Sequence, residues 1–201
     1  MPHPTIPYDN WQPLSLEETI TLFQDVPFAW CIAGGYVLEL FAGKAYRAHD
    51  DMDVVIYRDE QLAAQAWLSE WHLYAADPPG TLRTWQPGEY LPVGVHDIWG
   101  YQSGVNQWQF QFMIAEVNNG NWVSRHHPEI RFARDTLINI YNNIPCIRSE
   151  VQLLYKSRNR RPKDEVDFDV CVPLLSTHQK KWLRQNIQKL FPEGHPWLSR
   201  I

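Results

Sequence analysis

The pattern of apolar positions changes along the chain. Residues 28–33, 53–57 and 108–117 are short apolar runs, continuous or alternating, and each is bounded by polar residues or glycine. Such runs are typical of buried β-strands. From residue 149 onward, apolar residues instead recur at helical spacing. The pattern therefore predicts an α/β core over residues 1–148 and a C-terminal helical part of the same domain over residues 149–201.

Several helix ends are marked by residues that satisfy free backbone groups. Ser followed three positions later by Glu or Gln is typical of a capping box. Three such pairs predict helix starts: Ser15/Glu18, Ser149/Gln152 and Ser176/Gln179. Another helix is expected to open at the paired glycine 34–35 and to end at Gly43. A further helix is expected from Asp59, with Leu62 and Trp67 on its apolar face.

Composition limits the class of protein. The chain has 201 residues, of which 44% are hydrophobic, and this suits one domain with a sizeable core. A net charge of -5 argues against a protein built mainly to hold nucleic acid. No apolar run approaches the roughly 20 residues that cross a bilayer, and residues 1–14, an expected extended arm, do not resemble a signal peptide. We therefore expect a cytoplasmic protein without membrane contacts, whose Cys31, Cys146 and Cys171 are buried thiols.

Two carboxylates stand at the start of the apolar run 53–57. Side chains alternate along a strand, so Asp51 and Asp53 are expected to point to the same side. At about 4 Å and an effective dielectric near 20, their charges would repel by roughly 4 kcal/mol. Mg²⁺ removes this repulsion, because it binds through one or two carboxylates and completes its shell with water and phosphate. Gly34 and Gly35, at the start of a helix, would let the backbone approach that phosphate.

The same stretch resembles a known family. The paired glycine, the following helix and the R-x-H-D-D-x-D sequence from Arg47 to Asp53 are similar to the DNA polymerase β-type nucleotidyltransferase superfamily. The small aminoglycoside and lincosamide nucleotidyltransferases are the most similar members. The resemblance implies an α/β (α+β) fold, with a small mixed sheet flanked by helices. It also implies one or two Mg²⁺ ions at Asp51 and Asp53, and ATP or another NTP as co-substrate.

A second segment carries the same resemblance. Leu154-Tyr155-Lys156 and residues 161–165, RPKDE, are similar to a signature of these small nucleotidyltransferases. The resemblance implies that Arg47, Lys156 and Lys163 contact the triphosphate, with Lys156 favoured over Lys163. A simpler interpretation also explains why basic residues precede acidic ones in this segment. Basic residues stabilise the end of one helix, and acidic residues stabilise the start of the next.

Glu116 is the candidate for a third carboxylate. It stands near the end of the run 108–117, on the same face as Phe110 and Phe112. A lone acid at this place would usually be a carboxylate emerging into water. The resemblance instead implies an acid on a neighbouring strand that faces Asp51 and Asp53, where Glu116 would bind metal, accept the proton of the acceptor hydroxyl, or do both.

These observations predict a nucleotidyltransferase that moves a nucleoside monophosphate, with AMP from ATP favoured, to a hydroxyl of a small molecule. One alternative is a nucleotide-binding or toxin–antitoxin-type module on the same fold without catalysis. Another is an acidic protein in which the aspartates only cap a turn. An aminoglycoside, a lincosamide-like compound and other hydroxylated metabolites all stay open as acceptors, as do a protein or a tRNA, although the acidic balance disfavours RNA. Glu89 and Asp97 alone do not establish a site for a polycation.

Overall fold

The structure is a computed structural model, and it describes residues 5–201. Ten strands form one mixed sheet in this part of the chain, more than the small sheet expected. The strands are β1 (Trp30–Ile32), β2 (Asp53–Tyr57), β3 (Trp71–Ala76), β4 (Leu82–Thr84), β5 (Asp97–Gln102), β6 (Phe110–Asn118), β7 (Asn121–Ser124), β8 (His127–Ala133), β9 (Ile138–Tyr141) and β10 (Ile144–Ile147). Their order is β4-β3-β5-β6-β2-β1-β10-β9, and β7 pairs with both β6 and β8.

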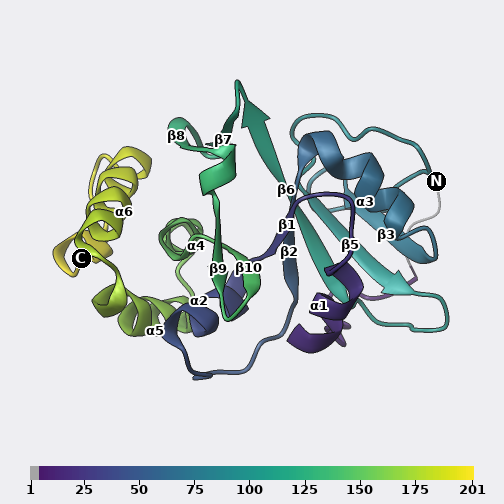
Figure 1. The fold of residues 1–201 in the computed structure, drawn as a ribbon, viewed down its shortest axis with the longest axis horizontal. Coiled ribbons are helices and arrows are strands. Elements are labelled where there is room, and N and C mark those ends of the chain that lie inside the picture. Colours follow the sequence, from purple (N-terminus) through teal and green to yellow (C-terminus); the bar gives the residue numbers. More distant parts are fainter. Residues whose placement is uncertain (1–4) are drawn as a thin grey trace.

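Six α-helices accompany the sheet within the described residues. They are α1 (Leu16–Phe23), α2 (Gly34–Ala42), α3 (Gln61–Trp67), α4 (Ser149–Lys156), α5 (Pro162–Cys171) and α6 (Thr177–Leu190). Short 3₁₀ turns occur at η1 (Arg58–Glu60), η2 (Arg134–Thr136), η3 (Val172–Leu174) and η4 (Pro196–Ser199). Helices α2, α4, α5 and α6 lie on one side of the central strands, whereas α3 lies on the other (Figure 1). The central strands are therefore covered on both faces.

Strand β2 occupies the middle of the sheet. It runs antiparallel to β1 and parallel to β6, and Asp53 lies opposite Gln111. Val54, Val55 and Ile56 are buried, which explains why the run is continuously apolar and not alternating. Asp53, the polar first residue of β2, therefore lies at the end of a buried central strand, which fixes the position of its backbone.

Most of the expected helix ends are present. Capping boxes begin α1 at Ser15 and α6 at Ser176, and Gly43 ends α2 in the left-handed conformation at φ 70°. The capping box expected at Ser149 is wrong. Arg148 is the N-cap of α4, and the side chain of Gln152 extends away from it to bind the backbone N–H of Gly34.

The apolar face expected for the helix after Asp59 is also wrong. Leu62 and Trp67 are exposed, and α3 instead buries Gln61 and Ala64. The amide of Gln61 explains this orientation, because it donates to the carbonyl of Arg58 and accepts from the N–H of Leu91. Gln61 is buried in place of Leu62 and Trp67 because its amide satisfies two buried backbone groups.

The remaining expectations concern cysteines and membranes. The three cysteines are buried, and none of them forms a disulfide within residues 5–201. No helix in that range combines the length and the apolar character that crossing a membrane requires. Of the expected N-terminal arm, residues 1–4 lie outside the described residues, and Trp11 forms a parallel bridge with Trp108.

Candidate active site

The paired glycine gives the backbone a path that a side chain would block. Gly34 has a φ of 67°, in the left-handed region, and a Cβ there would overlap the carboxylate of Asp53. A Cβ on Gly35 would overlap the guanidinium of Arg47 and the ring of His49. The start of α2 therefore passes directly against the acidic and basic side chains of the site, which only glycine permits.

Seven of the eight predicted site residues surround a single cavity of about 360 Å³. Asp53 comes from the first position of β2, and Asp51 from the loop just before it. The predicted residues that line the cavity are Gly34, Gly35, Arg47, Asp51, Asp53, Lys156 and Lys163. Residues more than 100 positions apart in the sequence thus meet at one place. The cavity combines acids that suit a metal with cations that suit phosphate.

The negative charges of Asp51 and Asp53 repel each other in the buried surroundings of Asp53. Burial, together with the negative charge of Asp51, raises the pKa of Asp53 to about 7. A divalent cation between hard oxygen ligands would remove this effect. No three-residue group of His, Cys, Asp or Glu within residues 5–201 is arranged to hold a metal, so the protein itself offers two carboxylates. That donor set fits Mg²⁺, which commonly takes its other ligands from water and substrate phosphates.

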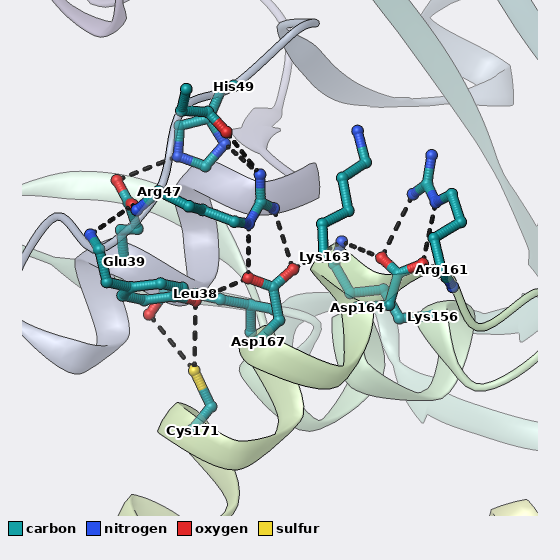
Figure 2. A network of polar contacts seen from close by, with 12 residues as sticks. Leu38, Glu39, Arg47, His49, Lys156, Arg161, Lys163, Asp164, Asp167 and Cys171 are labelled. Atoms are coloured by element: carbon teal, nitrogen blue, oxygen red, sulfur yellow. Dashed lines mark hydrogen bonds and ion pairs between the residues drawn. The ribbon is translucent and has the colours of Figure 1, made fainter.

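Asp167 on α5 organises two of the basic residues (Figure 2). Its carboxylate accepts hydrogen bonds from Nε and Nη2 of Arg47, at 2.8 and 2.9 Å, and forms an ion pair with Nζ of Lys156 at 2.9 Å. The side chain of Asp167 is fully buried. Because buried ion pairs of this kind fix geometry, Arg47 and Lys156 are held rigidly at the cavity wall.

Asp164 binds Lys156 from the other side. Nζ of Lys156 donates to Oδ1 of Asp164 at 2.8 Å, and Nε of Arg161 donates to Oδ2 at 2.9 Å. Burial opposes ionisation here, but the hydrogen bonds from Arg161 and Lys156 lower the pKa of Asp164 to about 2. Lys156 is therefore neutralised by two carboxylates, Asp164 and Asp167.

The side chains of Lys163 and Arg161 are more exposed to solvent than those of Arg47 and Lys156. Lys163 lies 3.0 Å from Asp50, whose side chain is 78% exposed, and the side chain of Arg161 is 57% exposed. A solvent-exposed pair such as Lys163–Asp50 contributes only about 0–1 kcal/mol, so a phosphate group can replace the carboxylate of Asp50 at little cost. Arg161, in contrast, also binds the buried carboxylate of Asp164. Arg161 was missed by the sequence prediction, although it stands in the RPKDE segment that contains Lys163.

Glu116 does not lie with the aspartates, and its expected position is wrong. In the register between β2 and β6 it follows Ala115, the partner of Tyr57, at the far end of β2 from Asp53. Both oxygens of its carboxylate, Oε1 and Oε2, accept from Nε of Arg58, at 2.7 and 2.8 Å. Arg58 is buried and also donates to the carbonyls of Leu91 and Val95. Glu116 is thus the counter-ion of a buried arginine that holds the 91–95 loop.

Gln152 is a further residue that the sequence prediction did not assign to the site. Its Oε1 accepts a hydrogen bond of 3.0 Å from the backbone N–H of Gly34, and it lines the same cavity as Asp51 and Asp53. In the sequence, Gln152 stands three positions after Ser149, a spacing that predicts a capping box and does not point to the contact with Gly34. Tyr155 and Asn159 complete the wall on the side of α4.

Comparisons with known proteins agree with the fold. No protein-family model and no curated protein sequence matches the chain. Among solved structures, it is similar to the lincosamide antibiotic adenylyltransferase LnuA bound to lincomycin, with a TM-score of 0.56, 17% identity, and coverage of 83% of this chain and 99% of that one. It is also similar to ANT(2")-Ia in complex with adenylyl-2"-tobramycin, with a TM-score of 0.56, 10% identity, and coverage of 87% and 95%. The chain therefore has the nucleotidyltransferase fold expected from the sequence.

Proposed function

We propose that this protein is a nucleotidyltransferase that moves a nucleoside monophosphate from an NTP to a hydroxyl of a small-molecule acceptor. One observation carries the proposal: the glycine turn, the acid pair and the basic residues of α4 and α5 surround one cavity. The fold of antibiotic-modifying nucleotidyltransferases supports the same class of reaction. ATP is the favoured donor, with AMP as the group transferred.

In this proposal Asp51 and Asp53 hold one or two Mg²⁺ ions. The metal supplies charge stabilisation to the attacking and leaving oxygens of an in-line displacement. The acceptor oxygen forms a bond to the α-phosphorus, the bond to the bridging oxygen breaks, and pyrophosphate leaves. The negative charges of the two carboxylates would hold the metal. A carboxylate-to-amide change therefore removes the metal site while it preserves side-chain size.

The phosphate contacts divide into two kinds. Lys163 is exposed enough to exchange its partner Asp50 for phosphate oxygens, and Arg161 can add a phosphate contact through its exposed end while it keeps its bonds to Asp164. Arg47 and Lys156 are held by Asp167, so they fix the shape of the wall. This reverses the order expected from the sequence, because Lys163 and not Lys156 becomes the favoured contact with the triphosphate.

The test is a pyrophosphate-release assay with MgATP and a panel of hydroxylated antibiotics and glycosides that includes lincomycin and tobramycin. Mass spectrometry of the same reactions detects an acceptor enlarged by AMP. Asp53→Asn is expected to abolish both signals and to leave the protein folded. Asp25→Asn, which removes one exposed acid outside the site, is the matched control. Full activity in folded Asp53→Asn protein, or an inactive parent across the panel, would overturn the proposal.

A further inference from the structure

Three basic side chains gather outside the cavity that contains the acid pair. Arg125 and His126 are the two residues of the turn between β7 and β8, and Arg158 stands two positions after the end of α4. Two-residue hairpin turns favour Asn and Gly, as at Asn119 and Gly120 between β6 and β7. The geometry of the β7–β8 turn therefore does not explain why two basic residues occupy it.

Arg125 and Arg158 both contact the ring of His126. Nη1 of Arg158 lies 2.7 Å from Nδ1 and 3.0 Å from Nε2 of the ring, and Nε of Arg125 donates to Nε2 at 3.4 Å. A guanidinium only donates, so the imidazole has to be uncharged to accept from it. Burial and the charges of the two arginines lower the pKa of His126 to about 4. The ring of His126 therefore joins two positive charges and adds none at neutral pH.

The two arginines have little negative charge around them. Among residues 5–201, Arg158 forms no ion pair with a carboxylate. Only Nη1 of Arg125 contacts an acid, Asp97, at 3.4 Å, and the two side chains are 28% and 32% exposed, so this pair is weak. An excess of positive charge thus stands in a protein whose net charge is -5. An oxyanion would relieve the repulsion between the guanidiniums, which bind phosphate and carboxylate oxygens well.

Tyr155 connects these basic residues to the active-site cavity. The guanidinium of Arg125 lies 5.8 Å from the centre of the Tyr155 ring, and the ring of His126 meets that ring edge-on at 6.0 Å. Tyr155 and Asn159, the neighbour of Arg158 in the sequence, line the cavity of about 360 Å³ that contains the acid pair, whereas the three basic residues do not. A ligand that reacts in the cavity can therefore extend past Tyr155 to the two arginines.

We propose that Arg125, His126 and Arg158 bind an anionic group, a phosphate or a carboxylate, of the acceptor. The inference rests on the proposed function and deepens it, because it makes the acceptor a hydroxylated small molecule with a negative charge. The triphosphate has contacts of its own inside the cavity, Arg161 and Lys163. An anion bound outside the cavity belongs to the other substrate. A polycationic acceptor would be repelled by the two arginines.

The first experiment tests the anion site without any reaction. Inorganic phosphate is titrated into the full chain, and NMR follows the ring signals of His126. Saturable shifts are expected in the parent and in Lys163→Gln, because Lys163 serves the triphosphate. Arg158→Gln should weaken this binding at least ~10-fold, since it removes a hydrogen bond to a charged group. Arg131→Gln, an exposed change on β8, is the control for loss of one positive charge and should stay within about twofold of the parent.

The second experiment assigns the anion to the acceptor. Pairs of hydroxylated compounds that differ only by a phosphate or carboxylate group are added to the panel above, and product formation with MgATP is measured by mass spectrometry. The anionic member of a pair is expected to react at least ~10-fold faster in kcat/KM, and Arg158→Gln should remove this preference. MgATP affinity, measured by calorimetry, should stay within about twofold in Arg158→Gln and should fall in Lys163→Gln.

The two experiments fail in different ways. Phosphate that leaves the His126 signals unchanged, or that binds equally well to Arg158→Gln, would overturn the anion site. An equal loss of MgATP affinity in Arg158→Gln and Lys163→Gln would assign the anion to the triphosphate and overturn the acceptor class. A parent that prefers neutral or cationic acceptors would overturn the acceptor class and leave the proposed function intact. A parent inactive with every acceptor would overturn both, and the phosphate titration would still decide the anion site.

Discussion

The side-chain carbonyl of Gln152 accepts a hydrogen bond from the backbone N–H of Gly34 across 118 positions of sequence. This bond joins the start of α2 to α4 and satisfies a buried donor at the edge of the site. It helps to hold the backbone of Gly34 in its left-handed conformation. The consequence is that a residue of the C-terminal helices sets the geometry of the N-terminal glycine turn.

Gln152→Met is expected to leave the N–H of Gly34 without its partner while preserving side-chain volume. An unsatisfied buried donor costs about 1–3 kcal/mol, so the free energy of unfolding should fall by that amount in urea titrations. Gln188→Met, at an exposed position of α6, is the control and should change stability by less than about 0.5 kcal/mol. Equal stabilities of the two variants would contradict the importance of this bond.

Gly34→Ala tests the close approach of backbone and carboxylate. The new Cβ would overlap Asp53 and would also sit at a positive φ, which costs about 1–2 kcal/mol by itself. Gly104→Ala separates the two effects, because Gly104 has a φ of 86° but nothing within 4 Å of an added Cβ. We expect Gly34→Ala to lose more stability than Gly104→Ala and to lose MgATP binding, as measured by thermal melts and calorimetry. Retained binding in Gly34→Ala would show that Asp53 can move aside freely.

Asp53→Asn is expected to stabilise the metal-free protein at high pH. The ordinary pKa of this carboxyl is 3.8, and it is raised to about 7 in the fold, so the folded state holds the proton more tightly than the unfolded chain. That contribution to stability is present below the unfolded value and is lost as the pH rises through 7. With a chelator, the variant should therefore melt about 2–8 °C above the parent at pH 8 and close to it at pH 4.

Magnesium supplies the second half of this test. It should raise the melting temperature of the parent at pH 8, since bound metal favours the ionised pair, and it should have no such effect on Asp53→Asn. A parent that is indifferent to magnesium would contradict the metal site.

Glu116→Gln is expected to affect stability and not chemistry. The change removes the charge that neutralises the buried Arg58, so the free energy of unfolding should fall by about 1–3 kcal/mol. Turnover per folded molecule should match that of the parent, since Glu116 lies at the far end of β2 from Asp53. Loss of turnover without loss of stability would return Glu116 to the site.

Short-range signals in the sequence were sufficient for many parts of this fold. The run beginning at Asp53 is a strand with the expected bounds, and the glycine pair opens a helix that Gly43 ends. Each of these features depends on residues within a few positions of one another. The cavity residues predicted from resemblance lie together for a related reason, because the two segments that carry them are each locally distinctive.

Features that depend on distant residues could not be predicted in the same way. Whether Gln111 or Glu116 faces Asp53 depends on the register between β2 and β6, which no local pattern fixes. The Ser-x-x-Gln pattern caps α6 at Ser176 but not α4 at Ser149, since Gln152 has a competing partner in Gly34. The availability of Lys156 likewise depends on Asp164 and Asp167, which neutralise it in the folded chain.

The carboxylate of Asp167 has a consequence for how such a chain can be divided. It holds Arg47 from the loop after α2 and Lys156 from α4, so one acid on α5 anchors basic groups contributed by both ends of the sequence. A fragment that stops after the last strand would retain the acid pair but lose Asp167, Lys156 and the partner of Gly34. Neither of two fragments divided at that point would contain all the residues that line the pocket.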